Sequence, residues 1–201
     1  MISGIDISDK NGIVNWQNSK ANSVQFVYMK ASESITKFDA VFTNNAAKAK
    51  ESGIPVGAYH WFHPHYNLNQ QIEIFTKQTG PLRGWLRPVI FLDKYITSTT
   101  NMERYLKQFL QGYTQKTGVK PIISTLDTFW KSYYAKAEWA CEYPLWIRST
   151  GFAWPRALYP WAGWTFWQHF RTARMAGMNN NDVGLNWFNG DLNELKSLVC
   201  K

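Results

Sequence analysis

The stretch RPVIFLDKYITS, residues 87–98, gives the clearest indication of the fold. Residues 89–92 form an apolar run, which is typical of a strand buried on both faces. Asp93 closes this run, and a carboxylate at the carboxyl end of a buried strand is a frequent place for catalysis in β/α barrels. Strand side chains alternate with period two, so the next side chain on the face of Asp93 belongs to Tyr95.

Segments typical of strands and helices alternate on both sides of this stretch. Strands are predicted at 2–8, 24–31, 54–62, 89–93, 122–125, 145–148, 165–170 and 184–188, and helices at 38–51, 67–79, 100–116, 126–137 and 191–199. Thr100 and Glu103 have the spacing of a capping box. The order predicts an α/β fold with a parallel sheet: a single irregular, TIM-like β/α barrel with few helices on its last three strands. We expect residues 1–201 to form a single domain, because no repeat or linker interrupts them.

Charge and composition indicate which classes of binding partner to expect. The net charge of +8 and the pI near 9.5 favour an anionic partner. The basic residues form no continuous run, so nucleic acid is not expected. No apolar stretch has the roughly 18 residues that a membrane span needs, so no membrane partner is expected either. The sequence leaves the oligomeric state open.

Two further features concern processing and redox state. The first residues, MISGIDIS, lack the charged and apolar regions of a signal peptide, so we expect none in this chain. The sequence does not decide whether Cys141 and Cys200 pair.

Acidic residues follow several predicted strands. Asp6, Glu33 and Asp93 each lie at the end of one, and barrel enzymes place their chemistry there. A single acid in such a place more often makes a salt bridge or a loop cap. Three that converge, in a chain with 11 Trp and 10 Tyr, favour a carbohydrate site. Glycoside hydrolysis needs one protonated acid and a second, ionised carboxylate, which explains why carboxylates would converge.

Several motifs in order carry a family resemblance. They are GIDIS at 4–8, FVYMKASES at 26–34, GIPVGAYHWFHP at 53–64, TGVKPIIST at 117–125, YPLWI at 143–147, FWQH at 166–169 and GLNWFNG at 184–190. Together with the strand that ends in Asp93, they resemble the glycoside hydrolase family 25 muramidases, the lysozyme-type enzymes of phages, bacteria and fungi. The resemblance implies an irregular barrel and cleavage of the β-1,4 bond between N-acetylmuramic acid and N-acetylglucosamine in peptidoglycan. It also implies action at the bacterial cell wall, extracellular or phage-delivered, and no metal or organic cofactor.

The chain departs from the family pattern at two acidic positions. The family reads Asp-x-Glu at the fourth strand, with the Glu as general acid, whereas this chain has Tyr95 there. The family's last strand reads Asp-Leu-Asn, whereas Gly184 precedes Leu185 here. A free tyrosine has a pKa of about 10 against about 4.3 for glutamate, and losing general acid catalysis costs about 10²–10⁴ in rate. We therefore expect a peptidoglycan-recognising protein whose hydrolysis is lost or strongly weakened.

Two alternatives stay open. An active cell-wall lysozyme would combine Asp93 with Glu33 or with Asp182, which lies two residues before Gly184, or would use Tyr95 itself. A virion or secretion component would reuse the barrel without catalysis.

Candidate binding residues follow from the same strand ends. The expected substrate contacts are Tyr59, Trp61, Tyr143 and Trp146 for stacking on sugar rings, and Gln168 and Asn186 for hydrogen bonds. An alternative role for Gln168 is to orient a neighbouring carboxylate. His60, His63 and His65 form H-x-x-H-x-H, but Pro64 breaks the segment and a metal site needs convergent ligands, so no metal is expected.

Overall fold

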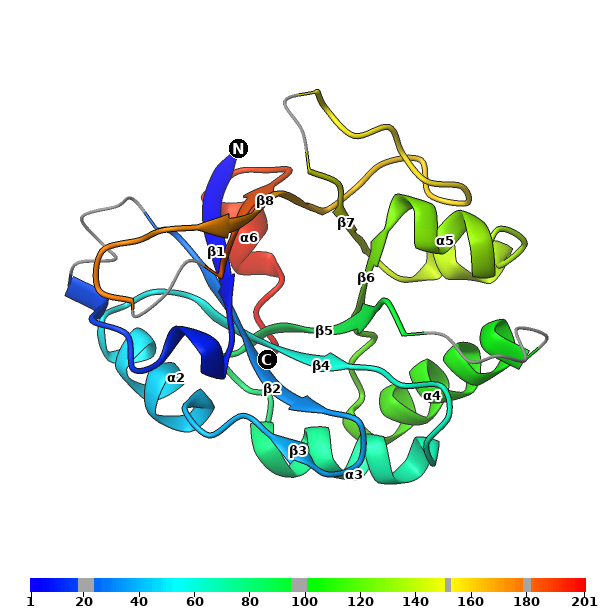
Figure 1. The fold of residues 1–201 in the computed structure, drawn as a ribbon, viewed down its shortest axis with the longest axis horizontal. Coiled ribbons are helices and arrows are strands. Elements are labelled where there is room, and N and C mark those ends of the chain that lie inside the picture. Colours follow the sequence, from blue (N-terminus) through cyan, green and yellow to red (C-terminus); the bar gives the residue numbers. More distant parts are fainter. Residues whose placement is uncertain (18–23, 95–100, 151–152, 179–181) are drawn as a thin grey trace.

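A closed β-barrel forms the centre of the molecule (Figure 1). The computed structural model describes residues 1–17, 24–94, 101–150, 153–178 and 182–201. The sheet runs in the order β1-β9-β8-β7-β6-β5-β4-β2-β3, and β1 pairs with β2 to close the barrel, so that β3 lies outside it. The strands are β1 (Ile2–Ile7), β2 (Val27–Glu33), β3 (Lys37–Phe38), β4 (Val56–Trp61), β5 (Leu86–Leu92), β6 (Ile122–Leu126), β7 (Leu145–Arg148), β8 (Phe166–Ala173) and β9 (Val183–Phe188).

The barrel is mixed rather than fully parallel. From β1 through β2, β4, β5, β6 and β7 to β8, each neighbouring pair of barrel strands is parallel. β9 runs antiparallel to both β8 and β1. Among the described residues between β8 and β9 there is no helix, and antiparallel neighbours need no crossover helix. The predicted irregular barrel is confirmed, and the expectation of a parallel sheet is wrong for this last strand.

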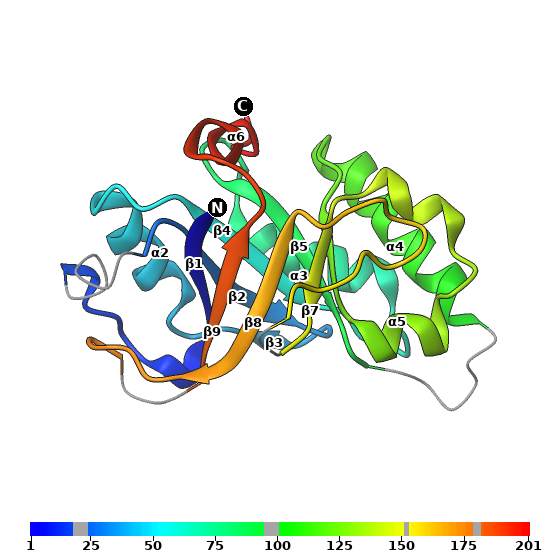
Figure 2. The ribbon, with the colours of Figure 1, turned by 90° about the horizontal axis from the view of Figure 1, so that it is seen from above.

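Most helices follow the first strands of the barrel. α2 (Phe42–Glu51), α3 (Leu68–Thr79), α4 (Met102–Thr117) and α5 (Asp127–Tyr133) follow β3, β4, β5 and β6, whereas α6 (Leu192–Ser197) follows β9. The 3-10 turns are η1 (Asp9–Asn11) and η3 (Glu138–Glu142). Figure 2 shows β9 and β8 on the near side of the barrel with no helix in front of them. The helices therefore become scarce along the last strands, as the sequence predicts.

α4 illustrates how the local sequence forms a helix. Its buried residues, Met102, Leu106, Phe109, Leu110 and Tyr113, recur at helical spacing and face the barrel. The helix ends at Gly118, whose left-handed φ of 72° suits glycine. Thr100, the expected cap, lies outside the described residues. The Glu103 carboxylate accepts a hydrogen bond from Trp139 Nε1 at 2.8 Å.

Large aromatic side chains fill the barrel interior. Strand alternation turns Phe26, Tyr28, Tyr59, Phe91, Trp146, Phe166 and Phe188 inward, and all belong to one buried cluster. Two glycines make room for them. A Cβ on Gly57 would lie 2.0 Å from the Tyr28 ring, and one on Gly4 would lie 2.5 Å from the Phe26 ring. This packed layer is the floor on which the polar side chains of the strand ends rest.

Two observations complete the description. Among the described residues, no helix is at once long and apolar enough to cross a membrane. Cys141 and Cys200 are free thiols.

Candidate active site at the barrel mouth

Polar side chains gather above the aromatic floor, where the parallel strands end. We call this region the barrel mouth. It is formed by Asp6 of β1, Lys30 and Glu33 of β2, Trp61 of β4, Asp93 after β5, Arg148 of β7, Gln168 of β8 and Asn186 of β9. Most are buried or half-buried, so their charges and hydrogen bonds must be satisfied largely within the protein.

Asp6 is held by two amide side chains. Its Oδ1 accepts hydrogen bonds from Gln168 Nε2 at 2.7 Å and from Asn186 Nδ2 at 2.8 Å. Burial raises the pKa of the Asp6 carboxyl, and these two hydrogen bonds act against the rise. Gln168 therefore orients a carboxylate, the alternative role weighed for it, and Asn186 does the same.

Gly184 gives Asp6 and Gln168 their space. A Cβ at position 184 would lie 2.0 Å from Asp6 Oδ1 and 2.5 Å from Gln168 Nε2. Any side chain there would force the Asp6 carboxylate to move and would break a buried hydrogen bond. The arrangement of Asp6 thus depends on a glycine in the facing strand.

Asp93 is surrounded by donors. Trp61 Nε1 donates to its Oδ1 at 2.5 Å, and Arg148 Nη1 lies 3.6 Å from its Oδ2. Lys94 Nζ lies 4.0 Å from Oδ1. The side chain of Asp93 keeps 15% exposure, so a ligand at the mouth can reach it only beside these partners.

Arg148, like Lys30, is a mouth residue that is not among the site residues predicted from the sequence. It is 3% exposed, donates from Nη2 to the Leu92 carbonyl at 2.7 Å, and places its guanidinium 4.6 Å from the Phe91 ring centroid. Among the described residues, its Nε has no hydrogen-bond partner. Burial lowers the pKa of the guanidinium and Asp93 acts against this, but arginine remains charged in proteins. An arginine at the end of the apolar run 145–147 was the available signal.

Glu33 is an ionised partner of basic groups. Lys30 Nζ lies 2.5 Å from its Oε2, His63 Nε2 lies 3.2 Å from its Oε1, and Lys37 Nζ lies 3.8 Å from Oε2. The hydrogen bond with His63, followed by that with Lys30, lowers the pKa of Glu33 to about 2. At neutral pH this carboxylate has no proton to give.

The comparisons with known proteins decide the family. The model of the family described as Glycosyl hydrolases family 25 matches residues 5–178. The chain belongs to this family. It is 30% identical to Lysozyme M1 of Streptomyces globisporus, over 98% of this chain and 71% of that protein.

Solved structures of family 25 relatives superpose closely. The crystal structure of the bacterial lysozyme from Streptomyces coelicolor has a TM-score of 0.91 at 28% identity, covering 98% of this chain and 96% of that one. The muramidase from Acremonium alcalophilum has a TM-score of 0.88 at 25% identity, covering 99% of each chain. The barrel is therefore that of a family 25 protein.

Asp182 and Tyr95, which the sequence suggests as catalytic residues, are not among the described residues of the barrel mouth. Asp182 has a 44% exposed side chain and lies 3.6 Å from Lys10 Nζ, so it belongs to a surface ion pair. Tyr95 lies outside the described residues.

Three aromatic candidates are core residues. Tyr59, Tyr143 and Trp146 are 3%, 6% and 0% exposed. Tyr59 stacks on Phe91 at 4.1 Å between ring centroids, and Trp146 packs inside the barrel with the floor. The prediction that these three stack on sugar is wrong, because no ring face is open. Trp61 is half-buried and lies 5.3 Å from Lys30 Nζ and 5.0 Å from Lys94 Nζ, measured to the ring centroid, so it remains the stacking candidate at the mouth.

His60 is held inside the protein by two polar side chains. His60 Nδ1 lies 2.9 Å from Ser32 Oγ, and its Nε2 lies 3.3 Å from Gln71 Oε1. Burial lowers the pKa of His60 to about 3. Within the described part of the chain, no group of three His, Cys, Asp or Glu side chains is placed to hold a metal ion.

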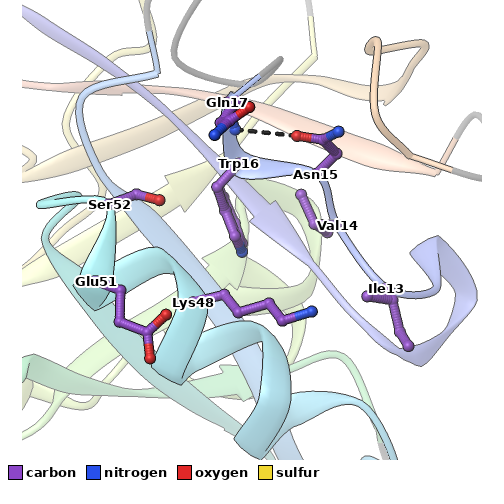
Figure 3. Close-up of a pocket in the computed structure, with 8 residues that line it drawn as sticks. All are labelled: Ile13, Val14, Asn15, Trp16, Gln17, Lys48, Glu51 and Ser52. Atoms are coloured by element: carbon purple, nitrogen blue, oxygen red, sulfur yellow. Dashed lines mark hydrogen bonds between the residues drawn. The ribbon is translucent and has the colours of Figure 1, made fainter.

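A separate surface pocket lies between residues 13–17 and α2 (Figure 3). Its volume is about 480 Å³, and Trp16, Lys48 and Glu51 are among its lining residues. None of the mouth residues lines it, so it is not part of the candidate active site.

Proposed function

We propose that the chain recognises the glycan of bacterial peptidoglycan at the barrel mouth, and that its hydrolysis of the bond between N-acetylmuramic acid and N-acetylglucosamine is lost or strongly weakened. Relatives whose names are lysozyme and muramidase support the substrate class. The proposed place of action is the bacterial cell wall, reached from outside or by phage delivery. The observation that carries the proposal is that every described carboxylate at the mouth is engaged by protein donors.

Weak hydrolysis follows from the absence of a suitable proton donor. The reaction needs an acid that is protonated near neutral pH and can reach the leaving oxygen. By resemblance, the family has its Glu where this chain has Tyr95 and an Asp where it has Gly184. Glu33, with a pKa of about 2, does not supply the proton, and Asp182 pairs with Lys10 at the surface.

Among the carboxyls of the barrel mouth, Asp6 is the one whose pKa is raised. Its side chain is buried, and both amide donors act on the same oxygen, which favours the ionised form. Arg148 adds a fixed positive charge close to Asp93. Such a charge opposes the positive charge that develops on the sugar in the transition state.

Binding of the glycan does not need a proton donor. Trp61 offers a half-buried ring next to Asp93, and the net charge of +8 suits an anionic wall. Binding can rest on a ring that stacks on a sugar and a carboxylate that accepts hydrogen bonds from its hydroxyl groups.

Two measurements on purified peptidoglycan sacculi test the proposal. We expect the natural chain to co-sediment with sacculi and to release few soluble muropeptides. Trp61→Ala should weaken co-sedimentation, whereas Leu192→Ala, an exposed apolar residue on α6, should not. Efficient release of muropeptides would refute the loss of hydrolysis. Release that Glu33→Gln or Asp182→Asn abolishes would establish the active alternative, and absence of binding would favour a protein-interaction role.

A further inference from the structure

A row of rings lies on the outer face of β8 and β9. We call it the outer aromatic row: Trp154, Trp164, Trp167, His169 and Trp187. The ring centroids of Trp154 lie 5.8 Å from Trp164 and 5.6 Å from Trp167. His169 lies 5.5 Å from Trp167 and 5.6 Å from Trp187, with its ring nearly parallel to that of Trp187. The rings thus form one contiguous cluster, in which Trp154 is exposed, Trp164, His169 and Trp187 are half-buried, and Trp167 is buried.

The row faces outward for a structural reason. On β8, Phe166 and Gln168 point into the barrel, so Trp167 between them points out. The described parts of the connections from β7 to β8 and from β8 to β9 contain no helix, and Figure 2 shows no helix in front of β8 and β9. Trp154 is 60% exposed. The Trp167 indole is fixed by its donation to the Ser149 carbonyl at 2.7 Å, so the exposed rings rest on a rigid base.

The surroundings of the row are basic. Residues 143–181 contain four arginines and not one aspartate or glutamate. Arg156, Arg171 and Arg174 are exposed. Arg156 follows Trp154 by two residues, and Arg171 follows His169 by two residues. A ligand on this wall would meet flat rings and guanidinium groups.

We propose that the outer aromatic row is a second contact surface for a glycan strand whose substituents carry carboxylates, as in peptidoglycan. The apolar face of a pyranose stacks on the exposed Trp154 indole, with the half-buried rings of the row beside it. The carboxylates of the strand pair with the exposed arginines, which bind carboxylates in a bidentate manner. This wall is separate from the barrel mouth, although its ligand class rests on the proposed function. Exposed apolar side chains that adjoin one another often mark a binding surface. The absence of Asp and Glu from residues 143–181 favours an anionic occupant.

The test compares variants by co-sedimentation with peptidoglycan sacculi. Trp154→Ala removes the most exposed ring, and Trp154→Ala with Arg156→Ala also removes a guanidinium. Ile13→Ala is the matched control, because Ile13 is apolar and 57% exposed outside the row. Thermal melting confirms that each variant folds. We expect the dissociation constant to rise about tenfold for the double variant, as for the loss of one interface anchor, and to stay unchanged for Ile13→Ala.

Each other outcome overturns the inference in a recognisable way. Unchanged binding by the folded double variant would overturn it while leaving the proposed function intact, provided that Trp61→Ala weakens binding. If neither Trp61→Ala nor the double variant weakens binding, both the inference and the proposed function are refuted. Competition by polyglutamate as strong as that by sacculus fragments would show that the surface binds any polyanion, and competition by neither would point to a protein partner.

Discussion

Glu33 offers the sharpest test of how the mouth carboxylates are used. Replacing it with glutamine removes the negative charge beside Lys30 while keeping the size of the side chain. In the folded protein the pKa of Glu33 falls from 4.5 to about 2. A full shift of this size corresponds to about 3 kcal/mol. Because the side chain keeps some contact with water, screening reduces the expected contribution to about 1–2 kcal/mol.

The sign of the pH dependence follows from the direction of this shift. A carboxyl whose pKa is depressed by folding stabilises the protein above its unfolded pKa, and this stabilisation is lost as pH falls through the folded pKa. The natural chain should therefore lose stability relative to Glu33→Gln between about pH 5 and pH 2. Urea unfolding at pH 6 and at pH 2.5 measures the difference.

A surface ion pair provides the control for this experiment. Glu142 pairs with Lys120 at 2.8 Å, and both side chains are exposed. Glu142→Gln should show no comparable dependence on pH. If the free energy difference between the natural chain and Glu33→Gln is the same at both pH values, Glu33 is not the ionised partner described here and becomes a candidate proton donor again.

Two further substitutions test the neighbouring contacts. Arg148→Met should destabilise the protein by about 3 kcal/mol, because it leaves Asp93 without its buried partner. A denaturant double-mutant cycle with Asp93→Asn should show coupling, and strict additivity would contradict the pairing. Gly184→Ala should cost about 1–3 kcal/mol, since its Cβ would lie 2.0 Å from Asp6 Oδ1. An unchanged melting temperature for Gly184→Ala would mean that Asp6 moves aside freely.

The sequence predicts the barrel well because its strands are marked by apolar runs. The strand at 145–148 coincides with β7, and the helix predicted at 67–79 begins only one residue late in α3. The direction of β9 was missed, since period-two alternation shows which face is buried but not which neighbour a strand pairs with. β8 continues to Ala173 through register shifts, which the apolar pattern does not reveal.

The sequence predicts only part of the candidate site, because local pattern shows where strands end but not which side chains meet in the fold. The positions of Asp6, Glu33 and Asp93 at strand ends follow from local pattern. The local pattern does not show how deeply a side chain is buried. Trp146 was therefore predicted to contact sugar, although it fills the barrel. The role of Arg148 depends on Asp93, which lies on a different part of the chain and comes close only in the folded barrel.

The release of reducing ends from purified peptidoglycan by the natural chain and by Tyr95→Glu tests the central claim most directly. The account predicts that the natural chain is nearly silent and that the variant gains at least about tenfold, since a general acid contributes about 10²–10⁴ in rate. Asp93→Asn in the variant background should remove the gain. Robust cleavage by the natural chain would contradict the account and would show that this barrel hydrolyses glycan with another acid.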